Sequence, residues 1–258
     1  MNHTPSGAEQ ISATASVPGP RLRVDALTVR FGGLTALDDV TFEVGPGEVV
    51  ALIGPNGAGK TTVFNAVCGL VRRAAGDIRI DGAPAPTRPA GLVGRGVART
   101  LQGLGLFDSM TVLENVLVPL ESRAITRSVD ATATASGCLG RLGIAALAST
   151  PVAALPYPER KRVALARALV TDPDLLLLDE PAGGLGEEDI AALADVVREV
   201  AASGCSVLLV EHHVDLVMGV ADRIVVLDFG RVIACGTPDE VRADPRVEEA
   251  YLGIEPAA

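Results

Sequence analysis

The feature that most constrains the fold is the glycine-rich stretch GPNGAGKTT at residues 54–62. It satisfies the pattern G-x-x-x-x-G-K-[ST], which is specific when a strand precedes it and a helix follows it. Both neighbours are expected here, because EVVALIG is a short apolar run typical of a buried strand and KTTVFNAVCGL has helical spacing. A strand–loop–helix unit of this kind is typical of a parallel α/β sheet.

The chemistry expected of this loop is phosphate binding. Glycines let the backbone curl so that consecutive N–H groups face a phosphate, and the following helix adds its dipole. Lys60 would supply a point charge to the β- and γ-phosphates, and Thr61 a hydroxyl to Mg²⁺. An ordinary glycine-rich turn is the alternative, and the full pattern in its context disfavours it. The predicted nucleotide-binding residues of the loop are Gly54, Pro55, Asn56, Gly57, Ala58, Gly59, Lys60, Thr61 and Thr62.

Two acidic residues end the apolar run LLLLDE at residues 175–180. A carboxylate that leaves the sheet beside a phosphate loop holds Mg²⁺ or its water, and Asp179 fits this role. Glu180 is placed to accept a proton from an attacking water. Alone, the pair would equally suit a solvated strand end, but the upstream loop favours a catalytic role. His212 follows a third apolar strand, CSVLLVEH, and is expected to contact a γ-phosphate or orient the water; a structural polar residue is the alternative.

The order of strand-like and helix-like segments predicts an α/β fold with a parallel sheet. RLRVDALTVRF alternates like a strand, DIRIDG reads as a strand that closes on an Asp-Gly turn, and DRIVVLDFGRVIACG reads as a hairpin. Residues 101–170 differ, with helical patches around a polar Ser/Thr/Ala stretch at 126–136, and are interpreted as an inserted, mainly helical subdomain.

Composition excludes several classes of protein. A net charge of −10 over 258 residues argues against a protein that coats nucleic acid, and no nucleic-acid partner is expected. The four cysteines contain no CxxC pair, so neither a zinc site nor a disulfide framework is indicated, and mostly buried, reduced thiols are expected. No apolar run approaches the roughly 20 residues that cross a bilayer. Residues 1–20 lack a signal-type segment and are interpreted as a disordered tail. The chain is 48% hydrophobic, which either a large parallel-sheet core or a face docked on a membrane protein would explain.

These motifs, in this order, resemble the nucleotide-binding subunit of ABC transporters over residues 21–253. The resemblance implies a P-loop NTPase (RecA-like) core with a parallel sheet, an N-terminal antiparallel β subdomain and the inserted helical subdomain, all within residues 21–258. It implies ATP and Mg²⁺ as cofactors. Phe31 in RFGGLTAL matches the aromatic residue that stacks on adenine, and Gln102 in ARTLQ matches the loop glutamine that links Mg²⁺ to the helical subdomain.

The same resemblance assigns the remaining site residues. Asp179 and Glu180 match the second nucleotide motif and its catalytic acid, and His212 matches the switch histidine. The implied metal ligands are therefore Thr61, Gln102 and Asp179, and the implied catalytic residues are Glu180, His212 and Gln102. Two positions depart from the family pattern: Gly186 replaces an acid in PAGGLGEED, and His213 stands where Asp is frequent.

Finer features look like the branched-chain amino acid uptake ATPases, with the urea and amide importers as close relatives. They are RFGGLTAL, ARTLQ, MTVLENV, PAGGL, EHHVDLVMGVADRIVVLDFG and the terminal AYLG. This likeness implies import of a solute through an integral membrane permease, an extracytoplasmic solute-binding protein acting indirectly, and a peripheral position on the cytoplasmic face of the membrane. The segment between Gln102 and Leu155 is shorter than is usual for the closest such subunits.

The family's signature Leu-Ser-Gly-Gly-Gln corresponds here to Leu155, Pro156, Tyr157, Pro158 and Glu159. In the family this segment caps the γ-phosphate of ATP bound to the other subunit of a dimer. Proline removes a hydroxyl and an N–H at one position and a second N–H at the other. Two lost bonds to a phosphate, at about 1.5–3 kcal/mol each, would weaken closure by roughly 10²- to 10⁴-fold. We therefore expect a heterodimer with a second ATPase that has a normal signature, whereas a homodimer with two working sites is the alternative. A non-transport ABC-type ATPase is a second alternative; it usually needs long insertions or two cassettes, which 258 residues do not accommodate.

Overall fold

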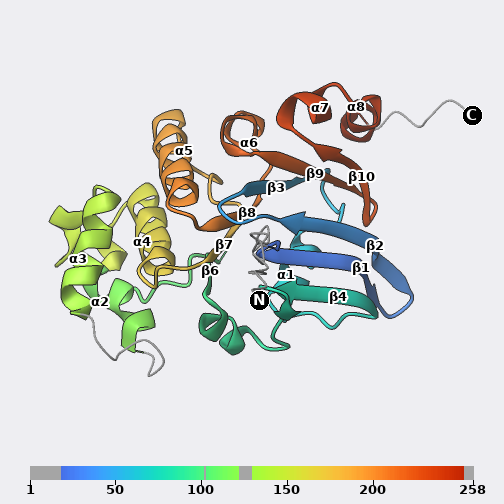
Figure 1. Ribbon diagram of the computed structural model, residues 1–258. Coiled ribbons are helices and arrows are strands. Elements are labelled where there is room, and N and C mark those ends of the chain that lie inside the picture. Colours follow the sequence, from blue (N-terminus) through green and yellow to red (C-terminus); the bar gives the residue numbers. More distant parts are fainter. Residues whose placement is uncertain (1–18, 102, 122–129, 253–258) are drawn as a thin grey trace, which may run out of the picture.

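The strand that precedes the phosphate loop lies in the middle of a six-stranded sheet (Figure 1). The computed structural model describes residues 19–101, 103–121 and 130–252. Five strands of this sheet are parallel, and β10 pairs antiparallel with β9 in the expected hairpin. The strands in spatial order are β10 (Arg231–Gly236), β9 (Arg223–Asp228), β3 (Val49–Ile53), β8 (Ser206–Val210), β7 (Leu175–Asp179) and β6 (Val97–Arg99).

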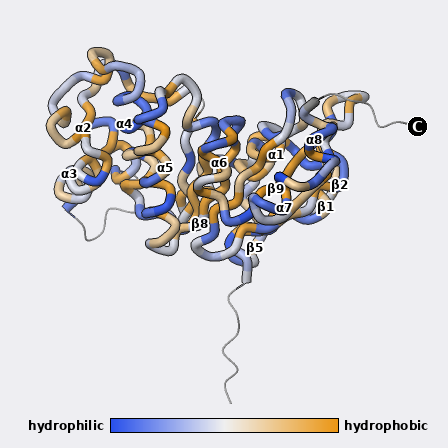
Figure 2. Tube along the Cα trace, turned by 90° about the horizontal axis from the view of Figure 1, so that it is seen from above, coloured by the Kyte–Doolittle hydropathy of each residue, from blue (hydrophilic) through white to orange (hydrophobic). Residues whose placement is uncertain are grey.

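Both faces of this sheet are covered, which explains why its strands read as continuous apolar runs. Successive side chains of a strand point to opposite faces. In β7, Leu175 and Leu177 pack in one core cluster, whereas Leu176 and Leu178 pack in another. Figure 2 shows the hydrophobic colour along β8 and β9 through the middle of the molecule.

A second, four-stranded antiparallel sheet comes mainly from the N-terminal segment and matches the expected β subdomain. Its order is β2 (Leu34–Val44), β1 (Leu22–Phe31), β4 (Ala75–Ile80) and β5 (Ala83–Pro84). Asp81 and Gly82 both have positive φ and form the expected turn between β4 and β5. Helix α1 (Lys60–Val67) packs in the core between the two sheets through Val63, Phe64 and Val67.

Helices cover the other face of the six-stranded sheet. α5 (Glu187–Ala202) and α6 (Val214–Val220) lie side by side, and α7 (Pro238–Arg242) and α8 (Pro245–Leu252) follow β10. α5 is amphipathic and buries Leu193, Val197 and Val200 in the core.

Between β6 and β7 the described residues form helices, and these lie to one side of both sheets in Figure 1. A fully buried Asn115 holds the start of this region, because its amide bonds the main chain of Phe107, Met110 and Thr111. The elements are α2 (Val112–Leu117), α3 (Ala131–Arg141), α4 (Tyr157–Leu169) and the 3₁₀ turns Val118–Glu121, Ala145–Leu147 and Val152–Ala154. Two further 3₁₀ turns, Pro89–Gly91 and Val93–Arg95, precede β6.

The fold class predicted from the sequence is confirmed, with local differences. Residues 131–136, interpreted as part of a polar stretch, are the first half of α3; the Asp130 side chain caps this helix by accepting from the N–H groups of Thr132 and Ala133. The short strand β6 and the helices α7 and α8 were not expected. The described residues contain no helix that is both long and apolar enough to cross a bilayer. Gln102 and residues 1–18 of the expected tail lie outside the described residues.

Candidate active site

The phosphate loop connects β3 to α1 through glycines that no other residue could replace without strain. Gly54 has a φ of 150°, and a Cβ there would lie 2.1 Å from the carbonyl oxygen of Leu227 in β9. Gly59 has a φ of 108°, and its Cβ would lie 2.7 Å from the Leu37 side chain in β2. By contrast, nothing lies within 4 Å of a Cβ built on Gly57. The backbone is therefore tightly packed at both ends of the loop and open in its middle, as a phosphate cradle requires.

Lys60 begins α1, and its side chain folds back over the loop. The Lys60 Nζ donates hydrogen bonds to the carbonyl oxygens of Gly54, at 2.6 Å, and Pro55, at 2.9 Å. Burial lowers the pKa of Lys60, and the Glu180 carboxylate opposes this shift. The ammonium is thus held at the loop, where it can donate to phosphate oxygens instead of these carbonyls.

The other predicted loop residues divide between packing and exposure. Ala58 is buried against the core, and its N–H donates to Pro55. Asn56 and Thr61 are exposed, and Thr62 is half-buried at the start of α1. Thr61 therefore offers its hydroxyl to solvent at a helix N-terminus, where anions and their metal ions bind. The ring of Phe31, at the tip of the β1–β2 hairpin, is 51% exposed and free to stack on a planar ligand.

Asp179 ends β7 at the carboxyl edge of the sheet, like the residues of the phosphate loop at the end of β3. Its N–H donates to the Thr100 hydroxyl, which follows the neighbouring strand β6. Burial raises the pKa of Asp179, the carboxylates of Glu180 and Glu211 raise it further, and Arg99 opposes them. A bound cation would stabilise the ionised form of such an acid. Within the described residues, no three or more His, Cys, Asp or Glu side chains form a cluster that could hold a metal ion by themselves. A Mg²⁺ ion suits such a site, because it takes one or two protein oxygens and completes its shell with phosphates and water.

Glu180 occupies a strained position directly after the strand. Its φ is 47°, in the left-handed region that non-glycine residues rarely adopt, and its N–H donates to Val210 in β8 at 2.8 Å. The turn that follows is closed by bonds from Gly183 N–H to Glu180 and from Leu185 N–H to Ala182. Strain at a residue with a proposed role in proton transfer is typical of functional sites.

His212 lies after β8 with its side chain 61% exposed, so it is available to a ligand. Its neighbour Glu211 is fully buried, and its carboxylate accepts from the N–H groups of Ala182, His212 and His213. His213 caps α6, because its Nδ1 accepts from the Leu216 N–H. His213 is thus the N-cap residue of α6, a position for which Asp is also suited.

The signature residues lie at the start of α4. Leu155 is buried, and Pro156 is the N-cap residue without any side-chain cap. Pro158 falls in the first helical turn, where its missing N–H costs the helix nothing. Tyr157 is exposed, and Glu159 has one buried oxygen, Oε2, without a partner among the described residues. Gly186 is likewise an N-cap without a side-chain bond, and the acids that favour the start of α5 are Glu187, Glu188 and Asp189 instead.

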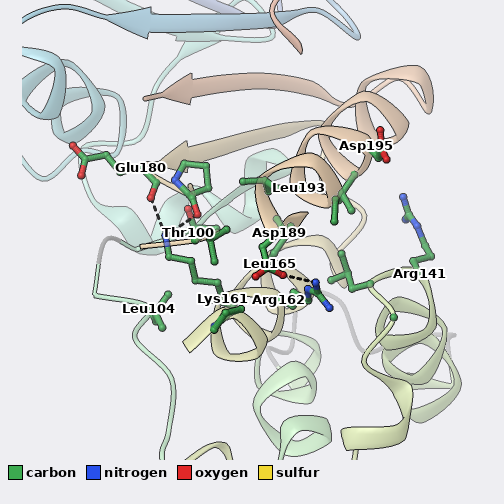
Figure 3. Close-up of a pocket in the computed structure, with 18 of the residues that line it drawn as sticks. Thr100, Leu104, Arg141, Lys161, Arg162, Leu165, Glu180, Asp189, Leu193 and Asp195 are labelled. Atoms are coloured by element: carbon green, nitrogen blue, oxygen red, sulfur yellow. Dashed lines mark hydrogen bonds and ion pairs between the residues drawn. The ribbon is translucent and has the colours of Figure 1, made fainter. Parts of the chain in front are cut away.

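A cavity of about 410 Å³ lies beside the turn that follows Glu180, between α4 and α5 (Figure 3). Its apolar wall includes Leu165 and Leu193, and Lys161 and Thr100 face it near Glu180. None of its described lining residues belongs to the phosphate loop, but Asp179 and Glu180 line it, so it adjoins the candidate ATP site.

The comparisons with known proteins agree with this geometry. The family model described as "ABC transporter" matches residues 37–183. The chain belongs to the ATP-binding subunits of ABC transporters. A second model, described as "Branched-chain amino acid ATP-binding cassette transporter", matches residues 231–257. As a member of this family, the chain is an ATPase coupled to transport.

Relatives and solved structures cover nearly the whole cassette. The chain is 40% identical over 253 residues to the Escherichia coli (strain K12) high-affinity branched-chain amino acid transport ATP-binding protein LivG, covering 91% of this chain and 98% of LivG. It is 34% identical over 233 residues to the Haemophilus influenzae lipopolysaccharide export system ATP-binding protein LptB, covering 90% of this chain and 97% of LptB. The ADP conformation of MJ1267, an ATP-binding cassette of an ABC transporter, superposes with a TM-score of 0.81 at 31% identity, covering 91% of this chain and 99% of MJ1267.

Sequence reasoning missed several residues around the ABC ATPase site. Glu211 and Lys161 make buried or half-buried polar contacts with the turn after Glu180. Tyr251 of the C-terminal α8 lies near the phosphate loop: burial raises its pKa, and the Gly54 backbone opposes the shift. The motif AYLG marked this segment, but only the structure shows what its tyrosine contacts.

Proposed function

We propose that this chain is the ATP-hydrolysing subunit of an ABC importer and that it energises uptake of branched-chain amino acids through a membrane permease. The observation that carries this proposal is the match to LivG along 98% of its length, together with the match of residues 231–257 to the branched-chain family model. BraF of Pseudomonas aeruginosa, named as a high-affinity branched-chain amino acid transport ATP-binding protein, is 38% identical and supports the same assignment.

The proposed reaction begins with ATP binding at the phosphate loop. Backbone N–H groups of Gly54 and residues 56–62 would face the phosphates, and the Lys60 ammonium would exchange the carbonyls of Gly54 and Pro55 for phosphate oxygens. Thr61 and Asp179, together with Gln102, would hold Mg²⁺, which neutralises charge on the β- and γ-phosphates when bound. The raised pKa of Asp179 supports this role, because a cation offsets the cost of burying the carboxylate and the repulsion from the neighbouring carboxylates.

Glu180 is proposed as the general base for the attacking water, with His212 orienting the γ-phosphate. The Glu180 carboxylate is close enough to the Lys60 ammonium to raise the pKa of Lys60. This proximity supports a single site that includes the end of β7 and the phosphate loop. The exposed His212 side chain follows β8, the strand between β3 and β7, so it leaves the same edge of the sheet. Phe31 would stack on the adenine.

The chain is proposed to work as a heterodimer with a second ATP-binding subunit. Solved ABC cassettes include a dimeric form, MJ0796, with a TM-score of 0.75 at 25% identity, covering 84% of this chain and 98% of MJ0796. Pro156 and Pro158 leave the first turn of α4 without a hydroxyl cap and with fewer N–H groups for a partner's ATP. A partner with an intact signature would complete the site that contains Glu180, and the reciprocal site would turn over slowly. The complex would lie on the cytoplasmic face of the membrane, with a solute-binding protein on the other side.

Transport assays test the solute. The chain is co-reconstituted in proteoliposomes with a branched-chain amino acid permease pair, its solute-binding protein and a second ATP-binding subunit, and uptake of radiolabelled leucine is measured. We expect ATP-dependent uptake that requires this chain and stops with Glu180→Gln. Uptake of urea or an amide but not of leucine would move the assignment to the related importers. Because the chain is also similar to LptB, lipopolysaccharide extraction is measured as a control for export.

A further inference from the structure

The Lys161 ammonium binds main-chain carbonyl oxygens of the turn that follows β7. Lys161 lies one turn into α4, and its Nζ donates to the carbonyl oxygens of Glu180, at 3.1 Å, and Pro181, at 2.6 Å. Figure 3 shows the ammonium directed at the main chain of Glu180, while the Glu180 carboxylate points away from it. Lys161 therefore binds the backbone from which the side chain of the proposed general base projects.

A second charged side chain, that of Glu211, also binds this turn. The buried Glu211 carboxylate accepts from the Ala182 N–H at 2.6 Å and from the N–H groups of His212, at 2.8 Å, and His213, at 3.1 Å. The attraction of Glu211 opposes the fall in the pKa of Lys161 that burial causes. The turn is thus bound by a cation at two of its carbonyls and by an anion at the Ala182 N–H.

An aromatic contact closes the arrangement. The Lys161 Nζ lies 5.5 Å from the centroid of the Tyr157 ring, within the range of a cation–π interaction. Gly184, with a φ of 76°, faces this ring so closely that a Cβ would lie 3.0 Å from a ring carbon. The first turn of α4, which belongs to the signature segment, therefore packs on the turn that follows Glu180.

We propose that Lys161 is a positioning residue for ATP hydrolysis: it couples the signature end of α4 to residues 180–184 and so fixes where the Glu180 carboxylate lies. Displacement of α4 would be transmitted to Glu180 through two hydrogen bonds and the Tyr157–Gly184 contact. Glu211 extends the coupling to His212, because one carboxylate binds both segments. This proposal depends on the role of Glu180 proposed above.

The test compares Lys161→Met with Lys161→Arg in the transport complex with its partner subunits. Methionine keeps an unbranched side chain of comparable length but donates nothing, whereas arginine retains donors for both carbonyls. A misplaced catalytic group costs up to about a hundredfold, so we expect kcat to fall by roughly ten- to a hundredfold with methionine. The KM for ATP should change less than about twofold, since the phosphate loop is untouched, and arginine should restore most of kcat.

The matched control is Arg160→Met on the same helix. Among the described residues, Arg160 pairs with Asp108 at 2.6 Å and makes no hydrogen bond or ion pair with the turn, so kcat should stay near that of the unaltered chain. Hydrogen–deuterium exchange of residues 181–185 should rise in Lys161→Met but not in Arg160→Met, with exchange of the phosphate loop unchanged in both.

Two results would overturn the proposal. One is unchanged kcat and exchange in Lys161→Met, and the other is a loss that arginine fails to restore and that comes with exchange raised throughout the chain. If Lys161→Met does not fold, Lys161→Gln, which keeps one donor group, is measured against the same expectations. Glu180→Gln is run in parallel: full activity in that variant refutes the role of Glu180, whereas an inactive Glu180→Gln beside a fully active Lys161→Met refutes only the role of Lys161.

Discussion

Replacing Pro156 by Ser and Pro158 by Gly would restore one hydroxyl and two backbone N–H groups to the signature segment. If the prolines are the reason why this chain needs a different partner, the double variant should associate with itself when ATP is bound. The substitutions are made in a Glu180→Gln background, so that ATP is retained. We expect the repaired chain to form a homodimer with ATP and Mg²⁺, and the unrepaired chain to remain largely monomeric.

The magnitude follows from the position of these prolines at the start of α4. Pro156 is an N-cap without a side-chain bond, so serine there should stabilise the helix by about 1 kcal/mol. Glycine in place of Pro158 should cost a similar ~1 kcal/mol, because the unfolded chain gains freedom. The stability of the monomer therefore changes little. Two restored bonds to a phosphate, at about 1.5–3 kcal/mol each, should tighten closure by roughly 10²- to 10⁴-fold.

Sedimentation velocity over a range of protein concentrations measures this change. Pro238→Gly is the matched control, since Pro238 also lies in the first turn of a helix, α7, outside the signature segment. It should leave self-association unchanged. If the repaired variant melts at the usual temperature yet dimerises no more tightly than the unrepaired one, then the prolines are accommodated by the local geometry and the reasoning for a heterodimer is wrong.

Three further predictions concern the site and the thiols. Gly54→Ala should abolish ATP binding and lower the melting temperature, measured by calorimetry, because its Cβ would lie 2.1 Å from a carbonyl oxygen of β9; normal binding would contradict the close packing of the loop. Burial and Glu180 raise the pKa of Asp179, so its ionised carboxylate destabilises the folded chain once the pH exceeds the pKa of Asp179 in the unfolded chain. Asp179→Asn should therefore raise the melting temperature at pH 7 by about 2–4 °C, and this gain should shrink toward pH 4. The same substitution should weaken Mg²⁺-dependent ATP binding. A thiol reagent at pH 8 should modify Cys235 alone within minutes, because it is exposed whereas the other cysteines are buried and burial raises the pKa of Cys205 to about 11; rapid reaction of more than one thiol per native chain would refute this.

The parts of the fold that the sequence predicts well are those in which information is local. The phosphate loop needs glycine where φ is positive and the backbone is crowded, so its spacing is visible without the rest of the chain. The strand Leu175–Asp179 can be predicted because both of its faces are buried from Leu175 to Leu178, and these four positions must then be apolar. The catalytic candidates Asp179 and Glu180 could be found for the same reason, since they stand where the apolar run stops.

Other features depend on contacts between segments far apart in the chain. Glu211 is an isolated acid in the sequence, and its importance comes from the Ala182 N–H, 29 residues away. Strand β6 has only three residues, too few for a period to emerge, and exists because β7 offers it a partner. Helix α3 is rich in Ala and Thr, and its composition resembles a linker until the Asp130 cap is taken into account.

The most direct test is equilibrium binding of ATP by the isolated chain. Titration of the Glu180→Gln variant with a fluorescent ATP analogue and Mg²⁺ should give one site per chain, with a Kd of roughly 1 μM to 1 mM. Adding Lys60→Ala should weaken binding by about ten- to a hundredfold, because the ammonium makes charge-assisted bonds to the phosphates. Equal affinity with and without the Lys60 ammonium, or no binding to a folded chain, would contradict the assignment of residues 54–62 as the ATP site.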